Sequence, residues 1–238
     1  MFRMLRTLPF TLALAALSIF TACGGSNSTK FRLVNAIPDV PQQQTIDVQI
    51  DGKVVGTVSL GSVTPGSGYL SVSSGSRHLQ VFLTGQTTSP YFDGNVTFNS
   101  GSNTVVATGS VTHNTIVAPL FADNATAPTS SNAGLRIIQA SPAGLGGNPA
   151  VDIYIVGAGG GLPGTSPDIA AVAYPAASAY KTFPAGTYDL LLTPAGIQSL
   201  NIRISNASFS TGKNYTYVLI DVQNGGQMSQ NPVVLNDN

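Results

Sequence analysis

The sequence predicts an all-β protein made of two tandem β-sandwich domains. Of its 238 residues, 26 are glycine and 15 are proline, only 8% are charged, and none is glutamate. Such a chain is poor in helix formers, whereas its Val, Ile and Thr favour strands. Short alternating apolar runs, separated by Gly, Pro, Asn or Ser about every ten residues, are typical of an immunoglobulin-like sandwich. The sequence also contains an internal repeat, with two similar copies along its length, which predicts two copies of that fold.

The first 22 residues are predicted to be a signal peptide (1–22) that is removed from the mature chain. Arg3 and Arg6 precede an apolar run of about 13 residues, 8–20. A membrane-spanning helix needs roughly 20 residues. The run therefore predicts a secretion signal and not a permanent transmembrane segment.

The signal ends in Phe20-Thr21-Ala22-Cys23, which resembles the lipobox of bacterial lipoproteins although that motif usually has Leu where Phe20 stands. The resemblance implies that Cys23 is the lipid-attachment residue and that residues 23–30 are a lipidated tether on a membrane. It implies a lipid-anchored protein of the cell envelope, on the outer membrane if the host is Gram-negative. Two or more acyl chains are enough to hold a protein on a bilayer. The alternative is an ordinary secretory signal with a chance cysteine.

The two copies begin with the same order of predicted strands. Residues 31–38 and 135–142 are strands that stop at a proline, and residues 46–50 and 151–155 follow as alternating, half-buried strands. Asp51-Gly52 predicts a two-residue hairpin, because both turn residues tolerate a positive φ. Arg32 with Asp47, and Arg136 with Asp152, predict a cross-strand ion pair in each copy.

Later positions of the copies hold a constant register, which sets the domain boundaries. We expect domains at 31–124 and 134–238, joined by a polar linker at 125–133. Copy two has six extra residues in its 157–179 stretch. An offset of 111 residues relates Tyr69 to Tyr180, Gly75 to Gly186, Gly85 to Gly196, Asn95 to Asn206, Phe98 to Phe209, Gly101 to Gly212 and Asn103 to Asn214.

Motifs shared by the copies resemble a known family, the domain of unknown function 4397. The motifs are an opening Arg-hydrophobic-hydrophobic-x-Ala-x-Pro, a Ser-x-Tyr triplet at 67–69 and 178–180, and Pro-Ala-Gly-Thr-Tyr at 184–188. Copy one departs from the last motif, having Ser73-Ser74-Gly75 in place of Pro-Ala-Gly. The family occurs in bacterial secreted and surface proteins, often in tandem, and has no established activity as a class. The resemblance therefore implies a fold and a location.

Composition disfavours several functions. Removal of Arg3 and Arg6 leaves eight basic side chains against ten aspartates, so we predict no nucleic-acid partner. Two histidines and one lipidated cysteine disfavour zinc, and the turn at Asp51 explains that residue better than calcium does. We predict no metal and no cofactor.

Two motifs resemble catalytic or cofactor-binding signatures. Residues 159–164 match G-x-G-x-x-G, but Pro163 and the glycines around it do not begin a helix, so we expect a flexible loop. Ser178 and Lys181 match S-x-x-K in a strand-like run, where the two side chains need not face one another. His78 and Asp189 are equivalent positions, which we expect to face solvent on strands. We predict that the protein is not an enzyme.

The predicted function is a non-enzymatic binding or scaffolding module of the cell envelope, with polysaccharide or another envelope protein as partner. We expect contacts along the elongated 157–179 stretch, with Tyr154, Tyr174 and Tyr180 as the aromatic contacts. One alternative is an envelope hydrolase that uses Lys181 or this loop region. Another is a passive structural spacer.

Overall fold

The computed structural model describes residues 28–129 and 131–238, so the signal peptide, Cys23 and most of the predicted tether lie outside the described residues. The all-β prediction is confirmed. Over the described residues the chain forms strands and one short 3₁₀ turn, Pro41–Gln43. None of the helical segments described is long and apolar enough to cross a membrane.

The first half of the chain forms two sheets. The inner sheet, which faces the second half, has the order β4-β1-β8-β9, with β5 also pairing with β1. The outer sheet has the order β3-β2-β6-β7. The inner strands are β1 (Ser28–Ala36), β4 (Val63–Thr64), β5 (Leu70–Ser73), β8 (Ser102–Thr108) and β9 (Leu120–Ala122). The outer strands are β2 (Ile46–Ile50), β3 (Lys53–Val58), β6 (Gly75–Leu83) and β7 (Phe92–Phe98).

The second half repeats this topology. Its inner sheet has the order β13-β10-β17-β18, with β14 pairing with β10, and its outer sheet the order β12-β11-β15-β16. The inner strands are β10 (Asn132–Gln139), β13 (Ala176–Ala177), β14 (Lys181–Pro184), β17 (Asn214–Leu219) and β18 (Val233–Asn236). The outer strands are β11 (Ala150–Gly157), β12 (Ile169–Ala173), β15 (Gly186–Pro194) and β16 (Ile202–Phe209).

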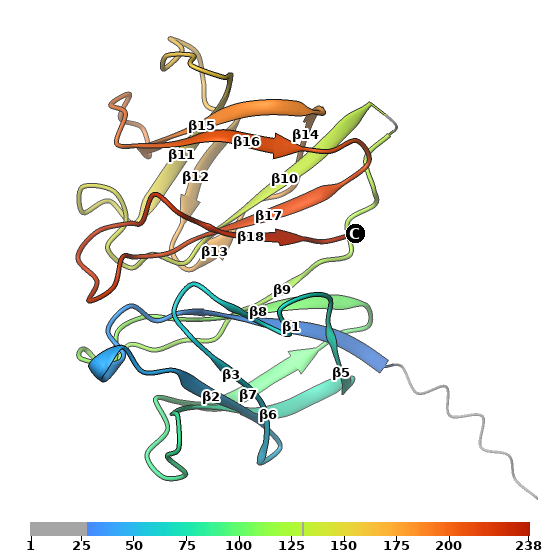
Figure 1. Ribbon diagram of the computed structural model, residues 1–238, viewed down its shortest axis with the longest axis vertical. Helices are drawn as coiled ribbons and strands as arrows, with labels where there is room; N and C mark the ends of the chain where they lie inside the picture. The colour runs from blue at the N-terminus through green and yellow to red at the C-terminus, as the bar shows by residue number, and fades with distance from the viewer. Residues whose placement is uncertain (1–27, 130) are drawn as a thin grey trace, which may run out of the picture.

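The four sheets stack as four layers, with the two inner sheets face to face (Figure 1). One apolar core fills each sandwich, and a third lies between the halves. The opening strands explain this arrangement. In β1, Phe31 and Leu33 point into the first sandwich while Val34 and Ala36 join the middle core. A strand buried on both faces reads as a nearly continuous apolar run, as residues 33–37 do.

The strand pairings are equivalent in the two halves. β1 pairs with β8 in parallel, and β10 pairs with β17 in the same way. Asp51-Gly52 joins β2 to β3 with both residues at positive φ, which confirms the predicted hairpin. The boundaries 31–124, 125–133 and 134–238 stay a prediction; β1 begins at Ser28 and β10 at Asn132.

Candidate functional site

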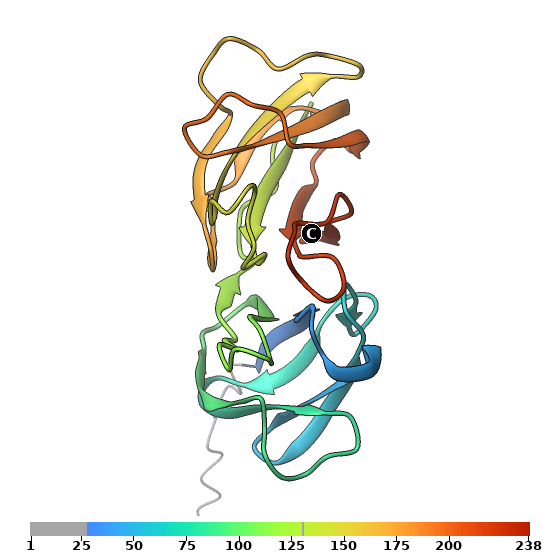
Figure 2. The same cartoon turned by 90° about the vertical axis from the view of Figure 1, so that its left-hand side faces the viewer.

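Loops from both halves meet at one end of the stack, the end toward which β1, β8, β10 and β17 run (Figure 2). The second-half loops enclose a cleft of about 600 Å³, the loop cleft. Loops of both halves line a hollow of about 290 Å³, the interdomain hollow. Ala143 and Gly226 line both, so the two spaces adjoin. The loop cleft is lined by residues 143–147, Asn201, Ile202, Val222 and 226–231.

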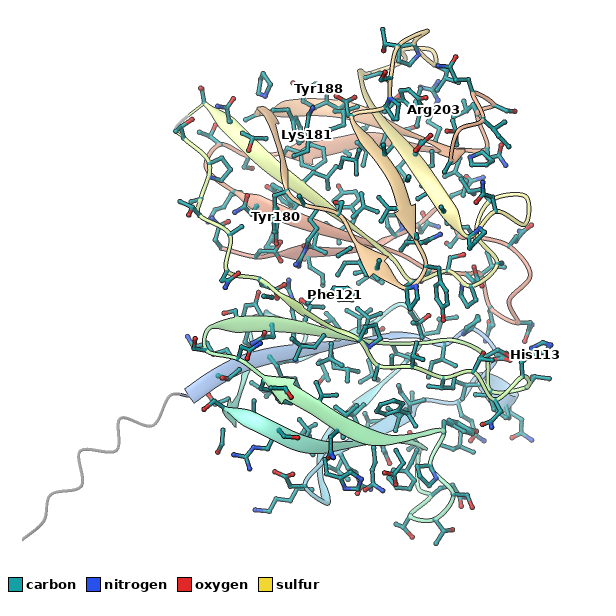
Figure 3. All side chains as sticks on the ribbon, turned by 180° about the vertical axis from the view of Figure 1, so that it is seen from behind. His113, Phe121, Tyr180, Lys181, Tyr188 and Arg203 are labelled. Carbon is teal, nitrogen blue, oxygen red and sulfur yellow. The ribbon has the colours of Figure 1, made fainter. Side chains whose placement is uncertain are left out.

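This loop end lies opposite the end where the described chain begins. β1 starts at Ser28 and runs to Ala36, a length of about 26 Å at the usual rise of a strand. Figure 1 shows the start of β1 and the C-terminus at the same end, and Figure 3 shows His113 at the other. The loop end and the start of the described chain therefore lie at opposite ends of the molecule.

The loop cleft combines an apolar floor with a neutral polar rim. Leu145, Ile202 and Met228 are buried and close its bottom. None of the described residues that line it is charged. Side-chain hydrogen bonds at the described rim tie Ser229 to the backbone of residue 231, which leaves the rim amides open to solvent. The rim carries four exposed amide side chains: Asn201, Gln227, Gln230 and Asn231.

Asp39 organises the first-half wall of the interdomain hollow. Its carboxylate accepts hydrogen bonds from Ser110 Oγ (2.6 Å), Val111 N (2.8 Å) and Thr112 N (3.1 Å). Burial alone would raise the pKa of Asp39, but these hydrogen bonds outweigh it and lower the pKa. His113 Nδ1 lies 2.9 Å from Ser110 Oγ. In a catalytic triad the histidine stands between serine and carboxylate; here Ser110 stands between them and gives its proton to Asp39.

Asp221 stands on the second-half wall of the same hollow. It is 3% exposed, and it accepts hydrogen bonds from the Ser141 hydroxyl and from Ala143 N (3.2 Å). Burial raises the pKa of Asp221, although both hydrogen bonds oppose the rise. Asp221 thus fixes the beginning of the β10–β11 loop, which forms one side of the loop cleft.

Backbone contacts hold these loops in place. Asn224 N in the β17–β18 loop donates to the Pro38 carbonyl of the first half at 2.8 Å. Gly144 has a φ of +60°, and a Cβ there would lie 2.0 Å from the Asn148 carbonyl oxygen. Because no other residue fits at that distance, the close approach at Gly144 shapes the wall of the loop cleft.

Two equivalent ion-pair clusters, called the reciprocal clusters, join the halves. Arg32 of β1 reaches into the second half, where its guanidinium donates to the Asp237 carboxylate and to the preceding backbone carbonyl. Arg136 of β10 makes the equivalent contacts with Asp123 (2.5 Å) and the carbonyl before it in the first half. Each arginine thus binds the end of the other half's last strand. The predicted pairs of Arg32 with Asp47 and Arg136 with Asp152 are wrong, because those aspartates belong to the outer sheets and cap loops there.

An aromatic ring completes each reciprocal cluster. The Arg32 guanidinium lies 4.8 Å from the ring centre of Tyr69, whose hydroxyl donates to Asp123 at 3.1 Å. Arg136 lies 4.9 Å from the ring centre of Tyr180, whose hydroxyl donates to Asp237 at 2.7 Å. Burial raises the pKa of both tyrosines. The register of 111 residues therefore relates two side chains with the same structural role.

The three tyrosines predicted as ligand contacts do not share one surface. Tyr154 is 2% exposed, so the prediction is wrong for this residue: its ring lies in the interior. Tyr180 is engaged by Arg136 and Asp237 between the halves. Burial raises the pKa of Tyr174, and a hydrogen bond with Thr108 of the first half opposes that rise.

The loop at 158–168 is fastened to the second sandwich. Asp189 accepts hydrogen bonds from Gly159 N (3.0 Å) and Asn206 N (2.9 Å) and pairs with Arg203 at 2.6 Å. Arg203 also donates to the Gly160 carbonyl at 2.8 Å. The expected solvent-facing position of Asp189 is therefore wrong, because the residue is 3% exposed and binds the loop. The Asn206 and Gly159 amides and Arg203, in that order, lower the pKa of Asp189.

Ser178 and Lys181 are used separately. Ser178 Oγ accepts a hydrogen bond from Ile137 N and donates to the Ala179 carbonyl at 2.7 Å. Lys181 Nζ lies 3.7 Å from Asp168 on the exposed side of β14. The hydroxyl proton of Ser178 is thus directed to a carbonyl and not to the lysine.

The amide rim was not predicted from the sequence. Its residues lie in loops without a repeated motif, and their spacing carries no signature of a site. Cys23 lies outside the described residues, so lipid attachment there stays a prediction. Within the described residues no three His, Cys, Asp or Glu side chains gather as a metal site.

Several solved structures are similar to this chain at low identity. They include the Bacillus anthracis TIE protein (14% identity, TM-score 0.27), CBMbc of family CBM26 from Eubacterium rectale Amy13K in complex with maltoheptaose (10%, 0.24), and a streptococcal virulence factor that binds α-glucan (10%, 0.25). The matches cover 82%, 86% and 85% of this chain and 34%, 97% and 97% of those chains. This chain therefore spans about a third of the TIE protein. These similarities are too weak to carry a conclusion about function.

A family comparison gives a firmer assignment. No curated protein matches the chain. The family model described as Domain of unknown function (DUF4397) matches residues 29–154, which is more than half of the chain. The match runs from β1 through the whole first half and ends in β11. The chain therefore belongs to the DUF4397 family.

Proposed function

We propose that the protein is a lipid-anchored, non-enzymatic binding module of the cell envelope, and that its loop end contacts envelope polysaccharide or another envelope protein. The observation that carries the proposal is the composite loop end. Loops of both halves line the interdomain hollow there, beside the loop cleft of the second half, at the end opposite Ser28. An anchor at Cys23 would place that end away from the membrane.

The way the halves are joined supports a binding role. A binding surface made from two domains keeps its shape only if the domains are fixed relative to each other. The middle apolar core, the reciprocal clusters and the hydrogen bond from Asn224 to Pro38 supply that fixation. A rigid site loses little conformational entropy when a ligand binds, which favours affinity.

A site-specific crosslinking experiment in intact cells tests the proposal. A photo-crosslinking side chain replaces His113 at the loop end or, as a control, Val54, which is 58% exposed on the outer sheet of the first half. We expect covalent adducts with an envelope component from position 113 and few from position 54. Equal labelling from both positions, or recovery of the protein outside the envelope, would overturn the proposal.

A further inference from the structure

We infer that the loop cleft of the second half binds a neutral saccharide chain. This inference rests on the binding function proposed above and names its ligand class. It moves the expected site from the 157–179 stretch, whose loop is fastened by Asp189 and Arg203, to the β10–β11, β15–β16 and β17–β18 loops.

The charge of the site defines the class of ligand. The described residues that line the loop cleft include no Lys, Arg, His or Asp. Phosphate, carboxylate and ammonium ligands need charged partners when they leave water, because an unpaired ion is costly to desolvate. Two carboxylates, Asp221 and Asp39, line the adjoining hollow, and each accepts hydrogen bonds from a neighbouring loop of its own half. A ligand that fills the loop cleft is therefore uncharged.

The rim matches hydroxyl groups. Each Asn or Gln amide offers two donor hydrogens and one acceptor oxygen. A sugar hydroxyl both donates and accepts, so adjacent hydroxyls on one ring can be bound by the two ends of a single amide. The exposed amides of Asn201, Gln227 and Gln230 surround the opening. They are free to make such contacts because the side-chain hydrogen bonds at the described rim belong to Ser229.

The floor matches the other side of a sugar ring. A pyranose ring presents C–H groups on its faces and hydroxyls at its edge. Leu145, Ile202 and Met228 close the bottom of the loop cleft with apolar atoms. Contact of the C–H face with this floor removes apolar surface from water, while the ring edge meets the amide rim.

Size and shape favour a chain of sugars over a peptide. The loop cleft has a volume of about 600 Å³, within the usual range of roughly 300–1,000 Å³ for ligand sites. The adjoining interdomain hollow gives room for further sugar units. A bound peptide commonly adds a strand to an open sheet edge. The loop cleft is instead lined by loop residues, except for Ile202 at the very start of β16, so no strand runs along it to pair with a peptide.

Calorimetric titration of the full chain in mild detergent tests the inference. The probes are cellohexaose, maltoheptaose and chitohexaose, with polygalacturonate as a charged saccharide and a neutral peptide of similar length. We expect saturable binding of at least one neutral saccharide and no saturable binding of the charged polymer or the peptide. Saturable binding of the peptide alone would overturn the saccharide assignment, and so would a lack of binding to all three neutral saccharides.

Matched variants locate the site. Gln227→Ala and Asn201→Ala each remove a rim amide and are expected to weaken binding about tenfold. Gln223→Ala removes an equivalent amide side chain from the β17–β18 loop, at a position that does not line the loop cleft. This variant should bind the saccharide with the same affinity as the unmodified protein. A melting temperature within error of the unmodified protein shows that each variant is folded. Equal affinities for all three variants would overturn the location.

The two proposals fail differently. If no neutral saccharide binds but crosslinks to an envelope component still form at position 113, the ligand class is wrong and the binding function stands. If neither crosslinks nor titration gives a signal, the binding function itself is wrong.

Discussion

Replacing Asp123 by alanine should destabilise both halves, because this carboxylate lies at the centre of a reciprocal cluster. It accepts hydrogen bonds from Arg136 (2.5 Å), Tyr69 (3.1 Å) and Thr104 (2.6 Å), and Arg32 lies 3.3 Å away. Its side chain has no measurable exposure to solvent. The substitution leaves a buried guanidinium without its charged partner and two hydroxyls without an acceptor.

The expected loss is large relative to the stability of a domain. Removal of one partner from a buried ion pair costs about 3–5 kcal/mol, and folded domains are stable by only about 5–15 kcal/mol. We therefore expect Asp123→Ala to lower the free energy of unfolding by about 3–5 kcal/mol. Because Asp123 and Arg136 belong to different halves, the variant should also split a single unfolding transition into two.

Urea denaturation followed by circular dichroism measures this loss. Asp93→Ala is the matched control, because Asp93 pairs with His78 on the exposed outer sheet. This variant should lower the free energy of unfolding by only a small fraction of the amount expected for Asp123→Ala. The double variant Asp123→Ala with Arg136→Met should be more stable than Asp123→Ala alone, because it removes the unpaired charge. A loss below about 1 kcal/mol for Asp123→Ala would refute the reasoning, since exposed pairs contribute that much.

Three further results are expected. The pKa of Asp39 in the folded protein lies below its unfolded value of 3.8, so its ionised carboxylate stabilises the fold above that pH, and this stabilisation is lost as the pH falls through the folded pKa. Asp39→Asn should therefore make the melting temperature less sensitive to pH below about 4. Residues 131–238 alone should dimerise in sedimentation experiments, because Arg136 can pair with Asp237 of a second copy; a stable monomer would contradict this. Gly144→Ala should lower the melting temperature more than Gly147→Ala, since a Cβ at 144 meets a carbonyl oxygen and one at 147 meets no atom within 4 Å.

The repeat made much of the fold predictable. A shared register of 111 residues requires equivalent positions in both copies, and Tyr69 and Tyr180 do stack on equivalent arginines. Local turn chemistry was equally informative, because Asp51 and Gly52 both adopt the positive φ that the hairpin needs. These features depend on short stretches of chain, which a sequence displays directly.

The partners of Arg32 and Arg136 could not be predicted, because they come from the other half. A period-two pattern shows which residues share a face of a strand, but not which sheet covers that face. The continuous apolar run of β1 indicates burial on both faces. It does not identify the second covering layer as the inner sheet of a repeated domain. Within one copy, the alternating pattern offers Asp47 as the partner of Arg32.

The amide rim of the loop cleft could not be predicted from the sequence for a different reason. Gln227 and Gln230 lie in a polar segment between two strands, and such segments are normally solvated connections. Only the folded chain brings them to Asn201, which follows β15 in another sheet. Neutral amide side chains do not titrate, and these residues do not form a recognisable sequence motif. The sequence alone therefore does not distinguish a binding site from an ordinary surface loop.

The interface between the halves restricts where the two copies can differ in sequence. Equivalent faces of the inner sheets are buried against each other, and Val34, Val106, Ile138 and Val218 are held there by the middle core. Change on these faces is costly in both copies. The loops beyond β10 and β17 lie outside this core and are constrained at separate points, namely Gly144, Asp221 and the contact of Asn224 with Pro38. If the loop cleft binds a saccharide as proposed, a duplicated sandwich joined in this way keeps the shared core constant, while the loops at its far end carry the ligand site.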